Sequence, residues 1–107
     1  MKTGMIKLSV LYPNKEGGTF DINYYLNTHI PIVAKLLGEA IKGATVEEGL
    51  SSAAPNFNAP FLAIGNLYFE SMESYQNSFG QNAPEIMADL PNFTDLEPVV
   101  QISSVKI

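Results

Sequence analysis

The stretch Phe61-Leu62-Ala63-Ile64-Gly65-Asn66-Leu67-Tyr68-Phe69 decides the fold of this chain. It is rich in aromatic and aliphatic residues and contains no proline or charged residue, so it predicts a long β-strand. Successive side chains of a strand point to opposite faces. One face carries Phe61, Ala63, Leu67 and Phe69, and the other carries Leu62, Ile64 and Tyr68. Both faces of this strand are therefore apolar.

Three further strands are predicted outward from this one. Residues 44–48 indicate a short strand, joined to it by the Ser/Ala/Pro/Asn-rich stretch Leu50–Pro60. That connection is longer than a hairpin needs, so we interpret it as a loop that closes a binding site. Apolar and polar residues alternate from Ile6 to Tyr12, which predicts a first strand, and Glu97–Ile107 is predicted as the last.

Helices are predicted in the two remaining segments. Apolar residues recur at helical spacing from Ile22 to Leu36, with Gly38 as a C-cap. Pro31 lacks the amide that would bond the Asn27 carbonyl, so a kink or break is expected near His29. Further along, Ser71 is predicted to cap a helix closed by Gly80, and another helix is predicted to start around Pro84.

The order of these elements is strand, helix, strand, strand, helices, strand. It predicts an α+β fold of the ferredoxin-like βαββαβ type, with a four-stranded antiparallel sheet and a single domain over residues 1–107. The helices of this plan cover only one face of the sheet. The other face is also apolar, so we expect a second copy of the chain to cover it in a homodimer.

Composition limits the classes of partner. The 107 residues include no cysteine and 11 acidic residues, for a net charge of −5. The six basic residues are all lysines, scattered singly, which argues against nucleic acid, and the lack of arginine argues against a clamp for anionic substrates. One histidine without cysteines gives no metal site, and no apolar run suits a membrane span. We expect a cytoplasmic protein with a neutral small-molecule ligand.

The candidate site is centred on His29, the only histidine. It is either a general acid or base or a structural residue bonded to a carbonyl freed by Pro31. Tyr12 and Tyr68 lie near strand ends, where a phenol can bond a substrate oxygen. Asn66 interrupts an apolar strand, so its amide either binds the ligand or satisfies neighbouring backbone.

Several of these residues form a familiar pattern. Tyr24-Tyr25 and Asn27-Thr28-His29-Ile30-Pro31-Ile32-Val33 resemble the EthD family of dimeric α+β barrel proteins, with His29 at the position of the family's characteristic histidine. The resemblance implies ferredoxin-like subunits that pair into a barrel, and a role in oxidative breakdown of ethers and other xenobiotics. We add Tyr25, from the same motif, to the candidate substrate-binding residues.

The resulting hypothesis is a cofactor-independent oxidoreductase or isomerase-type enzyme acting on a small, apolar, oxygenated molecule. His29 would move the proton, and Tyr12, Tyr25, Asn66 and Tyr68 would position the substrate. The alternative is a non-catalytic binding or accessory protein that serves a partner oxygenase. A binder needs the pocket but no titrating histidine.

Overall fold

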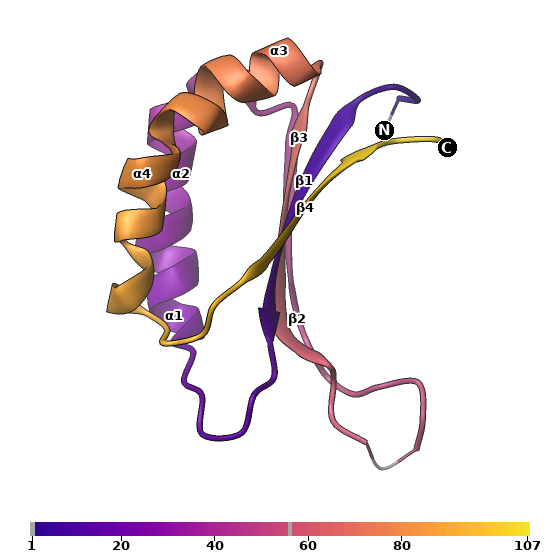
Figure 1. The fold of residues 1–107 in the computed structure, drawn as a ribbon, viewed down its shortest axis with the longest axis vertical. Coiled ribbons are helices and arrows are strands. Elements are labelled where there is room, and N and C mark those ends of the chain that lie inside the picture. The colour runs from indigo at the N-terminus through magenta and orange to yellow at the C-terminus, as the bar shows by residue number, and fades with distance from the viewer. Residues whose placement is uncertain (1, 56) are drawn as a thin grey trace.

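Four antiparallel strands form one sheet in the computed structural model, which describes residues 2–55 and 57–107. The strands are β1 (Ile6–Pro13), β2 (Gly43–Glu48), β3 (Phe61–Phe69) and β4 (Val99–Ser104), in the order β2-β3-β1-β4. The helices cover one face of the sheet and leave the other face open (Figure 1). The predicted ferredoxin-like α+β fold is confirmed, although β4 is shorter than the predicted last strand.

The first helical segment runs without a break from Ile22 to Leu37. It consists of α1 (Ile22–Tyr24), a π-helical turn (Tyr25–His29) and α2 (Ile30–Leu37), and a 3-10 turn (Gly38–Ala40) follows. The helix is irregular near His29, where a kink or break was expected, but it does not break. The amide of Ile30 donates to the Tyr25 carbonyl, five residues back, so the helix widens by one residue just before the proline and continues.

The second helical segment is also continuous. It consists of α3 (Met72–Tyr75), a π-helical turn (Gln76–Gly80) and α4 (Gln81–Ala88), followed by a 3-10 turn (Leu90–Asn92). The predicted cap is confirmed, since the Ser71 hydroxyl accepts from the Ser74 amide at 3.0 Å. The predicted end at Gly80 is wrong, because the π-helical turn carries the helix through to Pro84 and beyond.

The strand register assigns side chains to the two faces of the sheet. Leu8 pairs with Leu67 and Tyr12 with Ala63, and all four face the helices. The core on this side has two parts. One centres on Phe69 and Val33, and the other is an aromatic cluster that includes Tyr12, Tyr25 and Phe93.

The opposite, open face of the sheet mixes apolar and polar residues. Leu11 pairs with Ile64 there, and both are half-buried. Asn66 is only 4% exposed because its side chain bonds three neighbours on this face: it accepts from Ser9 at 3.2 Å and donates to Thr45 at 3.1 Å and Glu47 at 2.8 Å. The side-chain amide of Asn66 is therefore hydrogen-bonded to other side chains and not to the backbone.

The loop between β2 and β3 extends away from the helices, below the sheet and towards its open side (Figure 1). A lid over a site between the helices and the sheet would have to lie on the helix side. The position of the loop therefore does not match the predicted lid (Figure 1). Within the described residues, no helix has the length and apolar character needed to cross a membrane.

Candidate functional site

A cavity of about 170 Å³ lies between the helices and the sheet. Its wall is largely aliphatic, with Val10, Val33, Ile86 and Leu90 among the lining residues. The polar side chains on this face that border it are those of Tyr12, Tyr25 and His29. No charged side chain from the described part of the chain lines it. The cavity is therefore suited to an uncharged molecule that carries few polar groups.

The π-helical turn brings Tyr25 and His29 together at this cavity. Their rings stack with centroids 5.6 Å apart and an interplanar angle of 17°. Phe93 packs against the imidazole at 4.7 Å, and its carbonyl accepts from the Asp21 amide at 2.7 Å. The start of the first helix is thus tied to the segment after the second. The histidine ring packs against two aromatic rings that also contact each other, with centroids 5.3 Å apart.

Asp89 orients His29 from the end of the second helix. The Nδ1 atom of His29 lies 2.8 Å from Oδ2 of Asp89, and the two side chains are 5% and 12% exposed. The other carboxylate oxygen of Asp89 accepts from the Tyr24 hydroxyl at 2.8 Å and from the side-chain amide of Asn92 at 2.9 Å. Three donors from two parts of the chain therefore converge on one carboxylate.

The ionisation of Asp89 settles which nitrogen of His29 carries the proton. Burial by itself would raise the pKa of this carboxyl, but the donors from Asn92, His29 and Tyr24 outweigh it and hold the pKa below its ordinary value. A carboxylate can only accept, so in the neutral imidazole Nδ1 is the donor. Nε2 is then left with a lone pair that can take a proton.

Asp89 was absent from the residues predicted from the sequence. A carbonyl freed by Pro31 was the expected partner of a structural His29, but the structure gives the ring a carboxylate instead. The signal that points to Asp89 is weak: a carboxylate at the end of a helix, directly before Leu90-Pro91-Asn92. Such residues are usually solvated.

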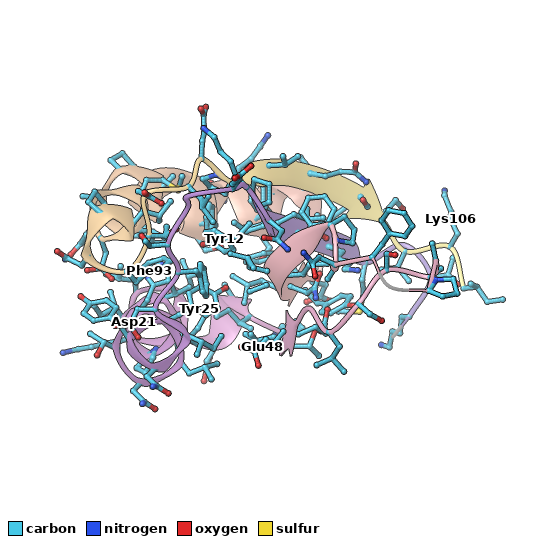
Figure 2. All side chains as sticks on the ribbon, turned by 90° about the horizontal axis from the view of Figure 1, so that it is seen from below. Tyr12, Asp21, Tyr25, Glu48, Phe93 and Lys106 are labelled. Carbon is cyan, nitrogen blue, oxygen red and sulfur yellow. The ribbon has the colours of Figure 1, made fainter. Side chains whose placement is uncertain are left out.

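Tyr12 and Tyr25 form a second buried pair at the cavity. They are 1% and 2% exposed, and their rings meet edge to face at 5.5 Å. Burial raises the pKa of Tyr25 to about 12, while a hydrogen bond from the Tyr12 side chain lowers it slightly. Burial also raises the pKa of Tyr12 far above its ordinary value. Both phenols are therefore neutral around pH 7. Figure 2 shows them beside Phe93, where β1 and the helix ends meet.

Gly65 of β3 supports this pair. A Cβ atom at this position would collide with the Tyr25 hydroxyl. We expect Gly65→Ala to push Tyr25 out of place and to lower the free energy of unfolding by about 1–3 kcal/mol, the usual cost of overpacking. Gly80→Ala is the matched control, because its Cβ would meet only ordinary contacts at 3.8 Å and beyond. It should be neutral or stabilising by up to about 1 kcal/mol. Urea unfolding of both variants checks this, and a stable Gly65→Ala protein would contradict it.

Two predicted site residues lie elsewhere. Tyr68 pairs with Lys7 on the open face, with the ammonium 6.0 Å from the ring centroid, so the expectation that it shares a cleft with His29 is wrong. Asn66 borders the cavity, but its side chain is bonded to Ser9, Thr45 and Glu47 on the open face. The structure thus brings Tyr12 and Tyr25 together with His29 and separates the other two by the thickness of the sheet.

These features define a small ferredoxin-like α+β domain with a histidine–aspartate pair beside an apolar cavity. A model of the EthD domain family matches residues 19–97, and the chain therefore belongs to the EthD domain family. A crystal structure described as an EthD-like protein from Ralstonia eutropha JMP134 is 39% identical, with 99% of this chain and 96% of that chain covered and a TM-score of 0.91. The resemblance seen in the sequence is confirmed.

More distant structures share the fold. An ethyl tert-butyl ether D (EthD) family protein from Bacillus halodurans C-125 is 21% identical, with 94% and 98% of the two chains covered and a TM-score of 0.65. A dimeric ferredoxin-like protein of unknown function from Thermobifida fusca YX is 13% identical, with 98% and 94% covered and a TM-score of 0.55. A comparison with curated proteins found no match.

Proposed function

We propose that this protein is an acid–base enzyme of small-molecule breakdown, acting on xenobiotic or aromatic compounds in the cytoplasm, with His29 as the proton-transferring residue. The observation that carries the proposal is the pairing of His29 with Asp89 at the wall of an apolar cavity. A histidine whose Nδ1 is held by a carboxylate is fixed in one tautomer and orientation, which is what general-base catalysis requires.

The cavity limits the size and charge of the substrate. A dry protein cavity of about 150 Å³ holds a benzene molecule, so a volume of about 170 Å³ fits a molecule with one ring or its aliphatic equivalent. The aliphatic lining favours an uncharged molecule. Tyr12 and Tyr25 are the hydroxyl groups available to bind its oxygen atom. The reaction class is either an oxidation that begins with proton removal or a proton-transfer isomerisation.

A panel of one-ring ethers, phenols and carbonyl compounds tests this function. Each compound is incubated with the protein in D₂O under air and analysed by mass spectrometry. Oxygen incorporation would identify an oxidation, and deuterium incorporation at carbon would identify proton transfer. Either result should depend on His29. Saturable binding of panel members without any chemical change would instead support the accessory binding protein.

We also propose that the open sheet face is the interface of a homodimer. Leu11, Ile64 and Val99 expose apolar surface on this face, and Val99 alone is 53% exposed. We expect Ile64→Lys to shift the protein from dimer to monomer, because a lysine would be buried in the interface without a partner. Leu26→Lys is the control, since Leu26 lies on a helix and is already 44% exposed. Analytical ultracentrifugation at micromolar concentration checks this. A wild-type monomer would contradict the proposal.

A further inference from the structure

The polar groups on the helix side of the cavity are two phenols and an imidazole that lie next to one another. Tyr12 comes from β1 and Tyr25 from the π-helical turn, and both are almost completely buried. Their rings meet edge to face with centroids 5.5 Å apart, and both side chains border the cavity. Each neutral phenol carries one O–H group that can be donated to a ligand. The two neighbouring rings therefore offer O–H donors to a ligand in the cavity.

The base lies next to these donors. Tyr25 stacks on His29, so its phenol and the imidazole border the same cavity from adjacent positions on one helix. Because these three side chains border one cavity of about 170 Å³, a molecule with one ring can contact a phenol and the imidazole at the same time. No lysine among residues 2–55 and 57–107 borders the cavity and the sequence contains no arginine, so the site does not suit the oxygen of a carboxylate or phosphate that needs a cation.

We infer that Tyr12 and Tyr25 are a donor pair for an oxygen that becomes negatively charged during the reaction, and that the substrate is a neutral one-ring carbonyl compound with an acidic C–H beside the carbonyl. This inference rests on the proposed function and names its substrate class. Ketosteroid isomerase shows that a tyrosine donor beside a carboxylate base suits this chemistry.

The step balances without an oxidant. The C–H bond breaks and its proton moves to Nε2 of His29, while the electron pair of that bond forms the C=C bond of an enolate. The carbonyl oxygen takes the negative charge and accepts a hydrogen bond from the tyrosine pair. The imidazolium formed is stabilised by the Asp89 carboxylate at 2.8 Å. Return of the proton to the same carbon gives exchange with solvent. In a substrate with a second C=C bond conjugated to the enolate, its return to the far carbon of that bond gives an isomer.

The donor pair can be tested with a stable mimic of the enolate. The phenolate of 4-nitrophenol has a negatively charged oxygen on one ring and absorbs visible light, and nitrobenzene has the same ring without that oxygen. We expect the wild-type protein to bind 4-nitrophenolate at least about tenfold more tightly than nitrobenzene, because a hydrogen bond to a charged group is stronger than a neutral one. Absorbance titration and ligand NMR measure the two affinities.

Three Tyr→Phe variants test the hydroxyl groups, because phenylalanine keeps the ring and lacks the hydroxyl. Tyr12→Phe and Tyr25→Phe should each lower the affinity for 4-nitrophenolate by about 10- to 100-fold. They should change the affinity for nitrobenzene by less than about threefold. Tyr75→Phe is the matched control, because Tyr75 packs in the other core cluster against Phe69 and does not line the cavity. It should leave both affinities unchanged. Thermal melts confirm that each variant is folded.

The outcomes distinguish this inference from the proposed function. If wild type and both cavity variants bind the two probes equally, the role of Tyr12 and Tyr25 as donors is overturned. The proposed function is tested independently by the dependence of the compound panel on His29. If neither probe binds the wild-type protein, the donor pair is also overturned. Selective loss of phenolate affinity in both cavity variants, with no change in Tyr75→Phe, supports it.

Discussion

Replacing His29 with glutamine should lower turnover by about a hundredfold to ten-thousandfold, the usual range for loss of a positioned acid or base. Glutamine keeps much of the volume and can still donate to Asp89, but it cannot accept and release a proton near neutral pH. The free energy of unfolding should fall by only about 1 kcal/mol, because Asp89 keeps its bonds from Tyr24 and Asn92. The change in turnover is measured with the compound identified in the panel. The change in the free energy of unfolding is measured by urea unfolding.

A control is needed because His29 is also part of a buried hydrogen-bond cluster. Tyr24→Phe removes a different donor to Asp89, and Tyr24 does not line the cavity. It should destabilise the protein by a similar amount, about 0.5–1.5 kcal/mol, and reduce turnover less than tenfold. If His29→Gln were destabilised but retained full turnover, His29 would be a structural residue, and the accessory binding protein would become the better interpretation.

The strands were predictable because each one carries its own signal. Period-two alternation defines β1, and an uninterrupted apolar run defines β3 within the observed bounds of Phe61–Phe69. The continuity of both helical segments was not predicted, because Pro31 was expected to disturb its helix and Pro84 to start a new one. A π-helical turn lies upstream of both Pro31 and Pro84, so each helix adjusts locally by one extra residue.

The candidate site was predictable only in part. His29 and Tyr25 lie in one short motif, and Tyr12 lies near the end of the first strand, so local sequence was enough to select them. Tyr68 was misplaced because the faces of two strands are related by their register, and Tyr12 pairs with Ala63 rather than with Tyr68. Asp89 is 60 positions from His29, and a carboxylate at a helix end gives no sign of the distant ring it will contact.

Replacing Asp89 with asparagine should lower turnover on the order of a hundredfold or more. The asparagine amide can donate to Nδ1 of His29, which would put the ring proton on Nε2 and remove the lone pair that acts as the base. The same substitution should change how stability depends on pH. The folded-state pKa of Asp89 is lowered, so its carboxylate stabilises the native protein above the unfolded value of about 3.9, and this stabilisation is lost as the pH falls through the folded pKa.

The difference in unfolding free energy between wild type and Asp89→Asn should therefore be largest near pH 7 and shrink below about pH 4. Asp95→Asn is the matched control. Asp95 accepts from the Thr19 amide at 2.8 Å, a bond that lowers its pKa, yet it lies away from the cavity. It should show the same sign of pH dependence with unchanged turnover. Because both carboxylates stabilise the fold in the same way, only a loss of turnover confined to Asp89→Asn assigns Asp89 to positioning the base. Equal turnover in the two variants would limit Asp89 to a structural role.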